Sequence, residues 1–291
     1  MAVTRTMPSG PVFQRNQVDV TIPGMGTETR VGSESVLTGN NLDLDFVTAG
    51  RVTAGNRSGV FGIEGSYMLT DTWTETAHAF GSPGRLLASP FTVVGAAVDP
   101  AVDNNTSAIV NYSTDMQSAE LNLTQRVYSG WNGDASLLYG VKSVWIDEAL
   151  RYESDNGLSN TQEVSVRNRM IGPQLGVLCE APFPGWTLDL ALKFAITNHS
   201  VDKSTIWNGL AAAANDNGAA LVSDIGINGT FFITPHLHLR IGYHVLSLTD
   251  VALATDNFEN SLPLLGAGVA DVHDNRGVAY QSLYLGMTLT H

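Results

Sequence analysis

The sequence has little of several features that mark common classes of protein. Its 291 residues include one cysteine, Cys179, so no disulfide can form within the chain. Charged residues make up 15% of the chain, against about a quarter in an average soluble domain. No apolar run reaches about 18 residues, so no membrane-spanning helix is predicted. The first residues also lack the apolar stretch of a signal peptide. This start predicts either a cytosolic chain or a precursor whose front end is missing from the sequence.

Positive charge is also scarce. There are 15 Lys and Arg residues against 28 Asp and Glu, which gives a formal net charge of −13. Nucleic-acid binding needs a basic surface, so this balance argues against a nucleic-acid partner. It argues equally against a polybasic protein that binds the membrane surface.

The chain is rich in alternating patterns. In the stretch GWTLDLALKFAIT, residues 185–197, every second residue from Trp186 to Ile196 is apolar, and Asp189 and Lys193 lie between them. A period of two predicts a β-strand with one apolar and one polar face. In a soluble sheet the apolar face points to a core, whereas in a membrane barrel it points to lipid.

Eight more segments show the same period. They are residues 42–52, 60–69, 118–128, 135–145, 168–180, 223–232, 236–245 and 281–291. Short connectors rich in Gly, Pro and Asn alternate with four long ones, at about 80–112, 153–163, 202–221 and 249–276. A membrane barrel has this asymmetry, with short periplasmic turns and long extracellular loops. The pattern therefore predicts an all-β fold, an antiparallel up-and-down transmembrane β-barrel.

The number of strands follows from parity. Because bacterial barrels have an even number of strands, a tenth is needed before residue 40. The alternating segment 17–24 can supply it. We therefore expect an N-terminal segment, 1–39, and a barrel of about ten strands, 40–291.

The aromatic residues also gather at the strand ends. Two aromatic girdles are typical of membrane barrels. The short-turn girdle would contain Trp131, Phe183, Trp186, Phe231 and Phe232, and the long-loop girdle Trp73, Trp145 and Tyr152.

Several motifs, in order, resemble a known family. AELNLTQRVY, LLYGVKSVWIDEAL, RNRMIGPQLGV, GWTLDLALKFAITNH, INGTFFITPHLHLRIGYHVLSL and YLGMTL are similar to the planctomycete outer-membrane β-barrel (beta-barrel porin-like) family, over about residues 40–291. The resemblance implies an outer-membrane, pore-forming barrel with no established catalytic residues. The sequence departs from that pattern in lacking a signal sequence and in ending on His291 rather than on an aromatic residue.

The inward faces predict the lining of the lumen. The predicted lining residues are Asp43, Asp45, Arg51, Glu64, Glu120, Arg126, Lys142, Glu148, Glu180, Asp189, Lys193, Asp224, His238 and Arg240. A ten-strand lumen is narrow enough for side chains nearly to fill it. These charges therefore predict either a plug held by ion pairs or a narrow path for ions or solutes. Their surplus of acids predicts a small, cation-preferring conductance, or almost none.

Catalytic and metal chemistry find little support in the sequence. His236, His238 and His244 share one strand face, but a metal site would need a further ligand from another strand. His78, His199 and His273 lie toward the long-loop end, where a barrel protease would need them, but without a motif. We expect no enzyme activity, no metal and no cofactor.

Two functions remain after these exclusions, with a soluble β-sandwich or lipocalin-like binder as a third, weaker alternative. The first is a porin-like pore for ions or small solutes in the bacterial outer membrane. The second is a plugged structural barrel whose long loops bind neighbours or a surface layer. The expected partners are outer-membrane lipid and either other envelope proteins or copies of the chain itself.

Overall fold

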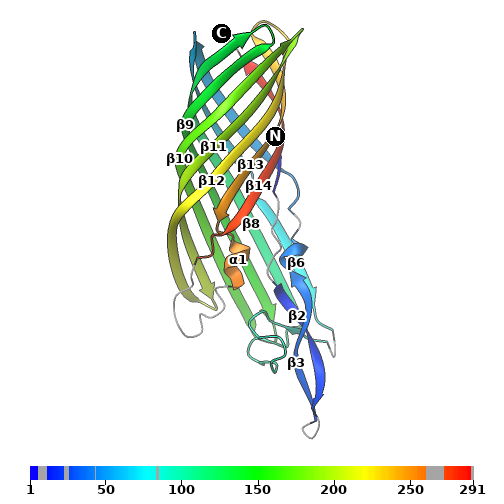
Figure 1. The fold of residues 1–291 in the computed structure, drawn as a ribbon. Coiled ribbons are helices and arrows are strands. Elements are labelled where there is room, and N and C mark those ends of the chain that lie inside the picture. The colour runs from blue at the N-terminus through cyan, green and yellow to red at the C-terminus, as the bar shows by residue number, and fades with distance from the viewer. Residues whose placement is uncertain (6–11, 23–25, 43, 83–84, 260–271, 290–291) are drawn as a thin grey trace.

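The computed structural model describes residues 1–5, 12–22, 26–42, 44–82, 85–259 and 272–289. The chain forms a tall antiparallel β-barrel (Figure 1), as the alternating pattern predicts. The strands of its main sheet are β1 (Ala2–Arg5), β4 (Val47–Ser58), β5 (Phe61–Thr70), β6 (Trp73–Phe80), β8 (Ser107–Gly130), β9 (Gly133–Asp155), β10 (Ser159–Phe183), β11 (Trp186–Trp207), β12 (Leu210–Phe232), β13 (Leu237–Val251) and β14 (Arg276–Leu289).

Pairing of β5 with β8 closes this sheet into a ring. The order around the ring is β5-β4-β1-β14-β13-β12-β11-β10-β9-β8, which gives ten positions. β6 continues β5 along the same edge of β8, after a one-residue shift between Leu69 and Trp73. Thr70 fills the break, because its hydroxyl donates to Met116 O and accepts from Met116 N. β5 and β6 therefore act as one interrupted strand.

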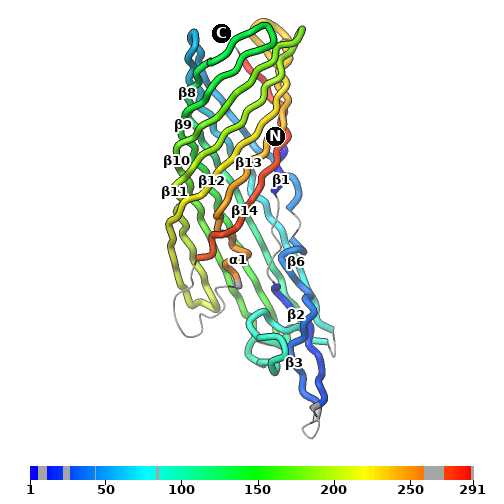
Figure 2. The backbone as a smooth tube through the Cα atoms, viewed as in Figure 1, coloured from blue at the N-terminus to red at the C-terminus, as the bar shows by residue number. Residues whose placement is uncertain are grey.

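The tenth position is filled differently from the prediction. Residues 17–22 belong to β2 (Val12–Ile22), which pairs with β3 (Gly26–Thr38) and β7 (Leu87–Ala88) in a separate three-stranded sheet. The short strand β1 takes the place in the ring instead, between β4 and β14. Figure 2 shows β1 and the N-terminus halfway along the barrel, beside β14. Parity requires some strand in that gap, but it does not say which segment supplies it.

Two of the four predicted long connectors are not loops. Strands β9 to β12 are 22 to 25 residues long, about twice the 9–11 residues that a tilted strand needs to cross a bilayer. They meet in tight turns, so most of the predicted connectors 153–163 and 202–221 is strand. At Asn208 and Gly209, φ values of 43° and 85° show a turn that favours this Asn-Gly pair. The other two predicted connectors stay long and join β6 to β8 and β13 to β14 at this end, which we call the outer end.

The exposed faces of the strands change character halfway along the barrel. On β11 the outward side chains from Leu190 to Ile196 are apolar, and Ile196 is 69% exposed. From Asn198 to Ser204 the outward residues are polar, namely Asn198, Ser200, Asp202 and Ser204, and the inward ones include the fully buried Val201. The apolar outward faces form a lipid-facing band in the half that carries the short turns, the short-turn end. The outer half instead has mostly polar outward faces, and its interior combines apolar side chains with buried polar ones.

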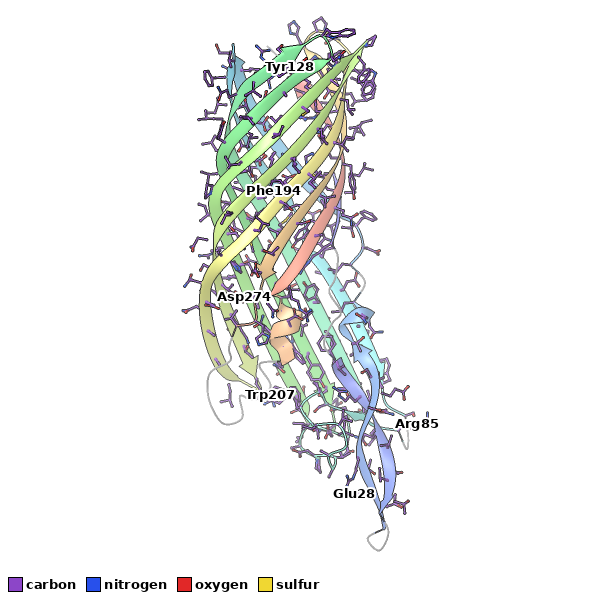
Figure 3. The ribbon with its side chains drawn as sticks, in the orientation of Figure 1. Glu28, Arg85, Tyr128, Phe194, Trp207 and Asp274 are labelled. Atoms are coloured by element: carbon purple, nitrogen blue, oxygen red, sulfur yellow. The ribbon has the colours of Figure 1, made fainter. Side chains whose placement is uncertain are left out.

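This change of polarity corrects part of the predicted aromatic girdles. Trp73 and Tyr152 are buried inside the barrel, at 2% and 0% exposure, instead of facing lipid. Leu42 and Leu44, which the alternation placed on the outward face, are also buried in the apolar core. At the short-turn end the prediction agrees with the structure, since Phe183 and Trp186 stack on the outward rim at 4.5 Å between centroids. Figure 3 places Tyr128 at this end, and Trp207 and Glu28 toward the other.

The single α-helix among the described residues, α1 (Ala254–Glu259), lies within the outer half. Among the described residues, no helix is long and apolar enough to cross a membrane. Phe258 of α1 is fully buried and contacts Phe13 of β2 and Tyr152 of β9 at 5.1 and 5.6 Å between ring centroids. The helix and the N-terminal sheet therefore contribute to one shared apolar core with the barrel wall. A 3₁₀ turn, Gly39–Asn41, connects this sheet toward β4.

Candidate functional site

The lumen opens at the short-turn end into a cavity of about 730 Å³. Its walls carry charges of both signs, including Arg57, Glu64, Glu180, Asp189 and Arg240. These charges pair loosely, with 3.8 Å from Arg57 to Glu180 and 3.5 Å from Arg240 to Asp189. The alternation of inward polar residues on β4, β5, β10, β11 and β13 produces this lining. The cavity can therefore hold water and small polar solutes.

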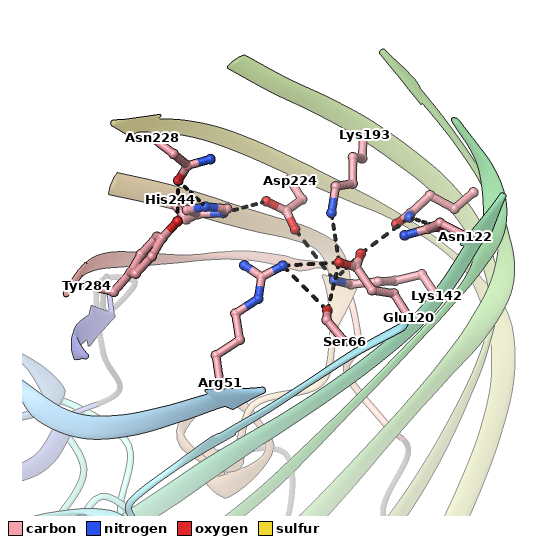
Figure 4. A network of polar contacts seen from close by, with 11 residues as sticks. Arg51, Ser66, Glu120, Asn122, Lys142, Lys193, Asp224, Asn228, His244 and Tyr284 are labelled. Carbon is pink, nitrogen blue, oxygen red and sulfur yellow. Dashed lines mark hydrogen bonds and ion pairs between the residues drawn. The ribbon is translucent and has the colours of Figure 1, made fainter. Parts of the chain in front are cut away.

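At the inner end of this cavity, Glu120 on β8 is the centre of a network of ion pairs (Figure 4). Its carboxylate lies 2.8 Å from Lys193 Nζ, 3.1 Å from Arg51 Nη2 and 3.4 Å from Lys142 Nζ. The Ser66 hydroxyl donates to it at 2.9 Å. Both carboxylate oxygens therefore have several partners from strands on different sides of the barrel.

A second carboxylate extends the network. Asp224 on β12 lies 3.5 Å from Lys142 Nζ and 3.3 Å from His244 Nδ1. The other ring nitrogen of His244 is 3.1 Å from the amide of Asn228, which in turn contacts the Tyr284 hydroxyl at 2.5 Å. We call Arg51, Glu120, Lys142, Lys193, Asp224 and His244 together the Glu120 network.

The network is deeply buried. The side chains of Glu120, Lys142 and Lys193 are 1%, 5% and 4% exposed. Buried charges are tolerated when they are paired and hydrogen-bonded, and removing one partner leaves a costly isolated charge. The network therefore spans the lumen with charges that are already paired with one another.

Beyond the network lies a layer of inward apolar side chains. The lumen first narrows to a space of about 30 Å³ next to Lys142, Asp224 and Leu246. The next inward residues form the apolar layer, which draws on eight strands: Val3, Met116, Val144, Met170, Ala195, Val222, Leu246 and Tyr280. Each is at most 6% exposed. Little of the surface of these side chains is open to water.

The segment before α1 seals the outer side of this layer. Asn168 on β10 donates to Ala252 O at 2.8 Å and accepts from Ala252 N at 2.9 Å. Its amide oxygen also lies 3.0 Å from His199 Nε2. Burial lowers the pKa of the His199 imidazole, although Asp274, Asp250 and Asp216 oppose this shift. A neutral His199 is therefore the form that suits this packing.

A buried ion pair anchors the same region. Arg5 of β1 lies 2.5 Å from Glu148 on β9, and neither side chain is exposed. Glu148 also accepts from Ala254 N at 2.8 Å, at the start of α1. Arg5 in turn donates to the hydroxyls of Tyr112 and Thr114. One carboxylate thus ties the N-terminal strand and α1 to the barrel wall.

The predicted lining residues have three kinds of position. Inside the barrel or its cavity the structure places Arg51, Glu64, Glu120, Lys142, Glu148, Glu180, Asp189, Lys193, Asp224 and Arg240. Arg126 and His238 lie at the short-turn rim, where Arg126 pairs with Asp134 at 3.2 Å and His238 contacts the Phe232 ring. Asp45 is exposed and outside any strand, because the neighbouring Leu44 turns inward to the core. Asp43 lies outside the described residues.

Sequence reasoning missed two buried cations. Arg5 is inside because β1 replaces the expected first strand, and Lys203 is 3% exposed on an inward position of β11. The alternation of β11 continues through Lys203, so its position could have been read from the period. With these two inside and Asp45 outside, the expected surplus of lumen carboxylates no longer holds among the described residues.

The histidines considered for catalysis or metal binding take separate roles. His78 is exposed and stacks on Phe80, whereas His199 is buried against Asn168. His273 is bound through its backbone to Asn257. Within the described ranges, no three His, Cys, Asp or Glu side chains gather as a metal site.

Comparison with known proteins identifies the family. The family described as "Putative beta barrel porin-7 (BBP7)" matches residues 20–265. The chain belongs to this family. The predicted resemblance to planctomycete members in particular stays a prediction. A search of curated proteins found no match to the chain.

One solved structure similar to this BBP7 protein is titled as the crystal structure of the outer membrane protease OmpT from Escherichia coli. The TM-score is 0.54 at 9% identity, and the match covers 100% of this chain and 96% of that chain. At such low identity the similarity shows the barrel fold alone and says nothing about activity.

Proposed function

We propose that this protein is a closed barrel of the bacterial outer membrane that anchors an extracellular interaction surface and has no enzymatic activity. The observation that carries the proposal is the buried Glu120 network, followed along the lumen by the apolar layer. A layer of packed apolar side chains across the lumen favours exclusion of water, and this supports a barrel that does not conduct hydrated ions. The family name and the OmpT-like fold support a barrel in the outer membrane.

The outer half supports the interaction role. About half of the length of β9 to β12 extends beyond the lipid-facing band, more than a barrier alone requires. The β2–β3 hairpin extends farther still (Figure 1) and carries Val18, Val20 and Val36 at 37–39% exposure. Long loops and hairpins on a rigid barrel are common places for binding. The expected partners are other envelope proteins.

A pore for small solutes is the second candidate. The cavity of about 730 Å³ at the short-turn end favours it, since it already provides half of a solute path. In that case the apolar layer and the segment before α1 would have to move aside.

Current through a planar bilayer separates the two candidates. The full chain, refolded in detergent and checked by heat-modifiable mobility, should give no steps above the baseline in KCl. A variant with Met116→Ser, Val144→Ser and Met170→Ser should conduct, because polar side chains of smaller volume admit water. The matched control, Met116→Leu, Val144→Ile and Met170→Leu, keeps the layer apolar and should stay silent. A steady, large current through the unmodified protein would contradict the anchor proposal, whether or not the serine variant folds.

A further inference from the structure

The outward face of β10 carries two arginines directly beyond the lipid-facing band. Ile171, the last apolar outward residue of this strand before them, is 56% exposed. The next outward residues toward the outer end are Arg169 and Arg167, and both are exposed. Arg167 pairs with Asp147 at 3.8 Å and has Asp202 opposite it on β11. Arg169 has no ion pair with a carboxylate among the described residues.

Two further hydrogen-bond donors flank Arg169. Trp145 of β9 and Ser200 of β11 lie directly opposite it in the register of the sheet, on the same outward face. Directly opposite residues on one face have Cβ atoms about 4.5–5.5 Å apart. A single group placed over Arg169 is therefore within reach of the guanidinium, the indole N–H and the Ser200 hydroxyl. We call these three residues the Arg169 site.

Other strands end their apolar outward faces differently. On β8 the first polar outward residue beyond the band is Gln117, whose side chain accepts from the Tyr67 hydroxyl at 2.9 Å. On β14 it is Gln281, whose side chain accepts from the Tyr243 hydroxyl at 2.8 Å. On β11 it is Asn198. Of these four strands, only β10 presents a cation at the edge of the lipid-facing band.

We propose that the Arg169 site binds the phosphate group of a lipid in the outer leaflet. This rests on the outer-membrane placement proposed above and names a lipid chemistry that the barrel recognises there. Headgroups lie at the edge of the hydrocarbon, which is where the apolar face of β10 ends. A guanidinium presents its N–H groups as a fork that matches two phosphate oxygens. Tryptophan suits the same depth, because its ring is apolar and its N–H is polar.

The charge of the whole chain makes this preference local. Its net charge is −13, so an anionic lipid is repelled on average and is attracted only where a cation is available. A soluble phosphate can meet the same guanidinium, but it has no acyl chains. A lipid adds contacts of its chains with Ile171 and Leu175, the outward residues of β10 that are 56% and 61% exposed. The site therefore favours a phosphate that is held at the membrane surface.

Local quenching by lipid tests the proposal. A bimane fluorophore is attached at Ile171→Cys in the full chain with Cys179→Ala, which is refolded in phosphatidylcholine vesicles and checked by heat-modifiable mobility. The quencher is phosphatidic acid with brominated acyl chains, compared with phosphatidylcholine that carries the same chains. Leu283→Cys is the matched control site, because Leu283 is the last apolar outward residue before Gln281 on β14 and is 58% exposed.

The expected result is a local preference for the phosphate monoester. At Ile171→Cys, the apparent binding constant of phosphatidic acid should be about fivefold that of phosphatidylcholine, the gain expected from one basic residue at an anionic surface. At Leu283→Cys the two constants should be similar. Arg169→Gln should abolish the preference at Ile171→Cys. Arg151→Gln removes the same charge from the same outward face, but Arg151 lies farther out, opposite Glu163, so this control should keep the preference.

Three results would overturn the proposal alone. The first is an equal preference at Ile171→Cys and Leu283→Cys, and the second is a preference that survives Arg169→Gln. The third is displacement of phosphatidic acid by millimolar inorganic phosphate, which would assign the site to soluble anions. Absence of quenching by either lipid at both positions would contradict the membrane placement and this proposal together. None of these results depends on conduction, so the bilayer current is a separate test of the closed anchor.

Discussion

The short-turn half and the outer half of the same strands bury opposite faces. In the short-turn half, leucines and isoleucines face out, and the inward positions hold the Glu120 network. In the outer half the inward positions hold Val164, Val166 and Val201, and the outward ones hold polar residues. The chain keeps a period of two throughout, but the side chosen for apolar residues changes where the solvent outside changes from lipid to water.

The two halves also handle buried charge differently. The Glu120 network brings together side chains from six strands, with three cations around two carboxylates. In the outer half, Glu148 has one cationic partner, Arg5, and otherwise binds backbone and neutral groups. The first arrangement bridges the polar lumen of the short-turn half, and the second fastens β1 and α1 to the barrel wall in the outer half.

Removing the central carboxylate should have the largest effect. Glu120→Gln leaves Lys142 and Lys193 buried without a full counter-charge. The unfolding free energy should fall by about 3–5 kcal/mol, as for other broken buried pairs. Urea unfolding in lipid vesicles measures this. Asp147→Asn is the control, because its pair with Arg167 lies on the surface at 3.8 Å with both side chains more than half exposed. The control should change by at most about 0.5 kcal/mol, and equal losses in both variants would contradict the assignment.

A charge placed on the outward face sharpens the comparison along one strand. Leu192→Lys puts an ammonium group in the middle of the lipid-facing band and should cost about 2–4 kcal/mol of unfolding free energy. Ser204→Lys, on the same face of β11 but in the outer half, should be nearly neutral, since Ser204 already faces water. Both variants are compared by urea unfolding in vesicles. Similar losses of unfolding free energy in the two variants would mean that the lipid-facing band does not end between Leu192 and Ser204.

The smallest expected effect is a pH dependence of the outer half. Burial lowers the pKa of His199 in the folded protein, below its value of about 6.5 in the unfolded chain. The neutral form is therefore favoured by folding, and this stability is present above the unfolded pKa and lost as pH falls through the folded pKa. Thermal unfolding at pH 7 and pH 5 should show a larger fall for the unmodified protein than for His199→Gln. His78→Gln, at an exposed position, is the control and should lose as much thermal stability between pH 7 and pH 5 as the unmodified protein. An equally large loss in His199→Gln would refute the role of His199 in this pH dependence.

Much of the barrel could be predicted from the sequence. The period of two in residues 186–196 and the turns near Trp131 and Phe183 depend on local chemistry, and the structure agrees with them. Inward positions such as Glu120 and Lys193 follow from the same alternation. Their pairing could not be predicted, because it depends on which strands face each other across the lumen.

Other features depend on context that a local pattern lacks. The alternation around Trp73 and Leu44 does not say whether lipid or water lies outside, so these residues were assigned to the wrong face. The extension of β11 and β12 had a local signal in Asn208-Gly209, which marks a hairpin rather than a long loop. β1 had none, because four residues are too few to show a period.

The central claim is that one strand passes from lipid to water between Ile196 and Asn198. Spin labels at outward cysteines along β11, from Leu188 to Ser204 in a Cys179→Ala background, test it directly in lipid bilayers. Collision with oxygen, which concentrates in lipid, should dominate through Ile196. Collision with a water-soluble nickel complex should dominate from Asn198 onward. Lipid-like accessibility that continues through Asp202, or water-like accessibility at Leu192, would contradict the account.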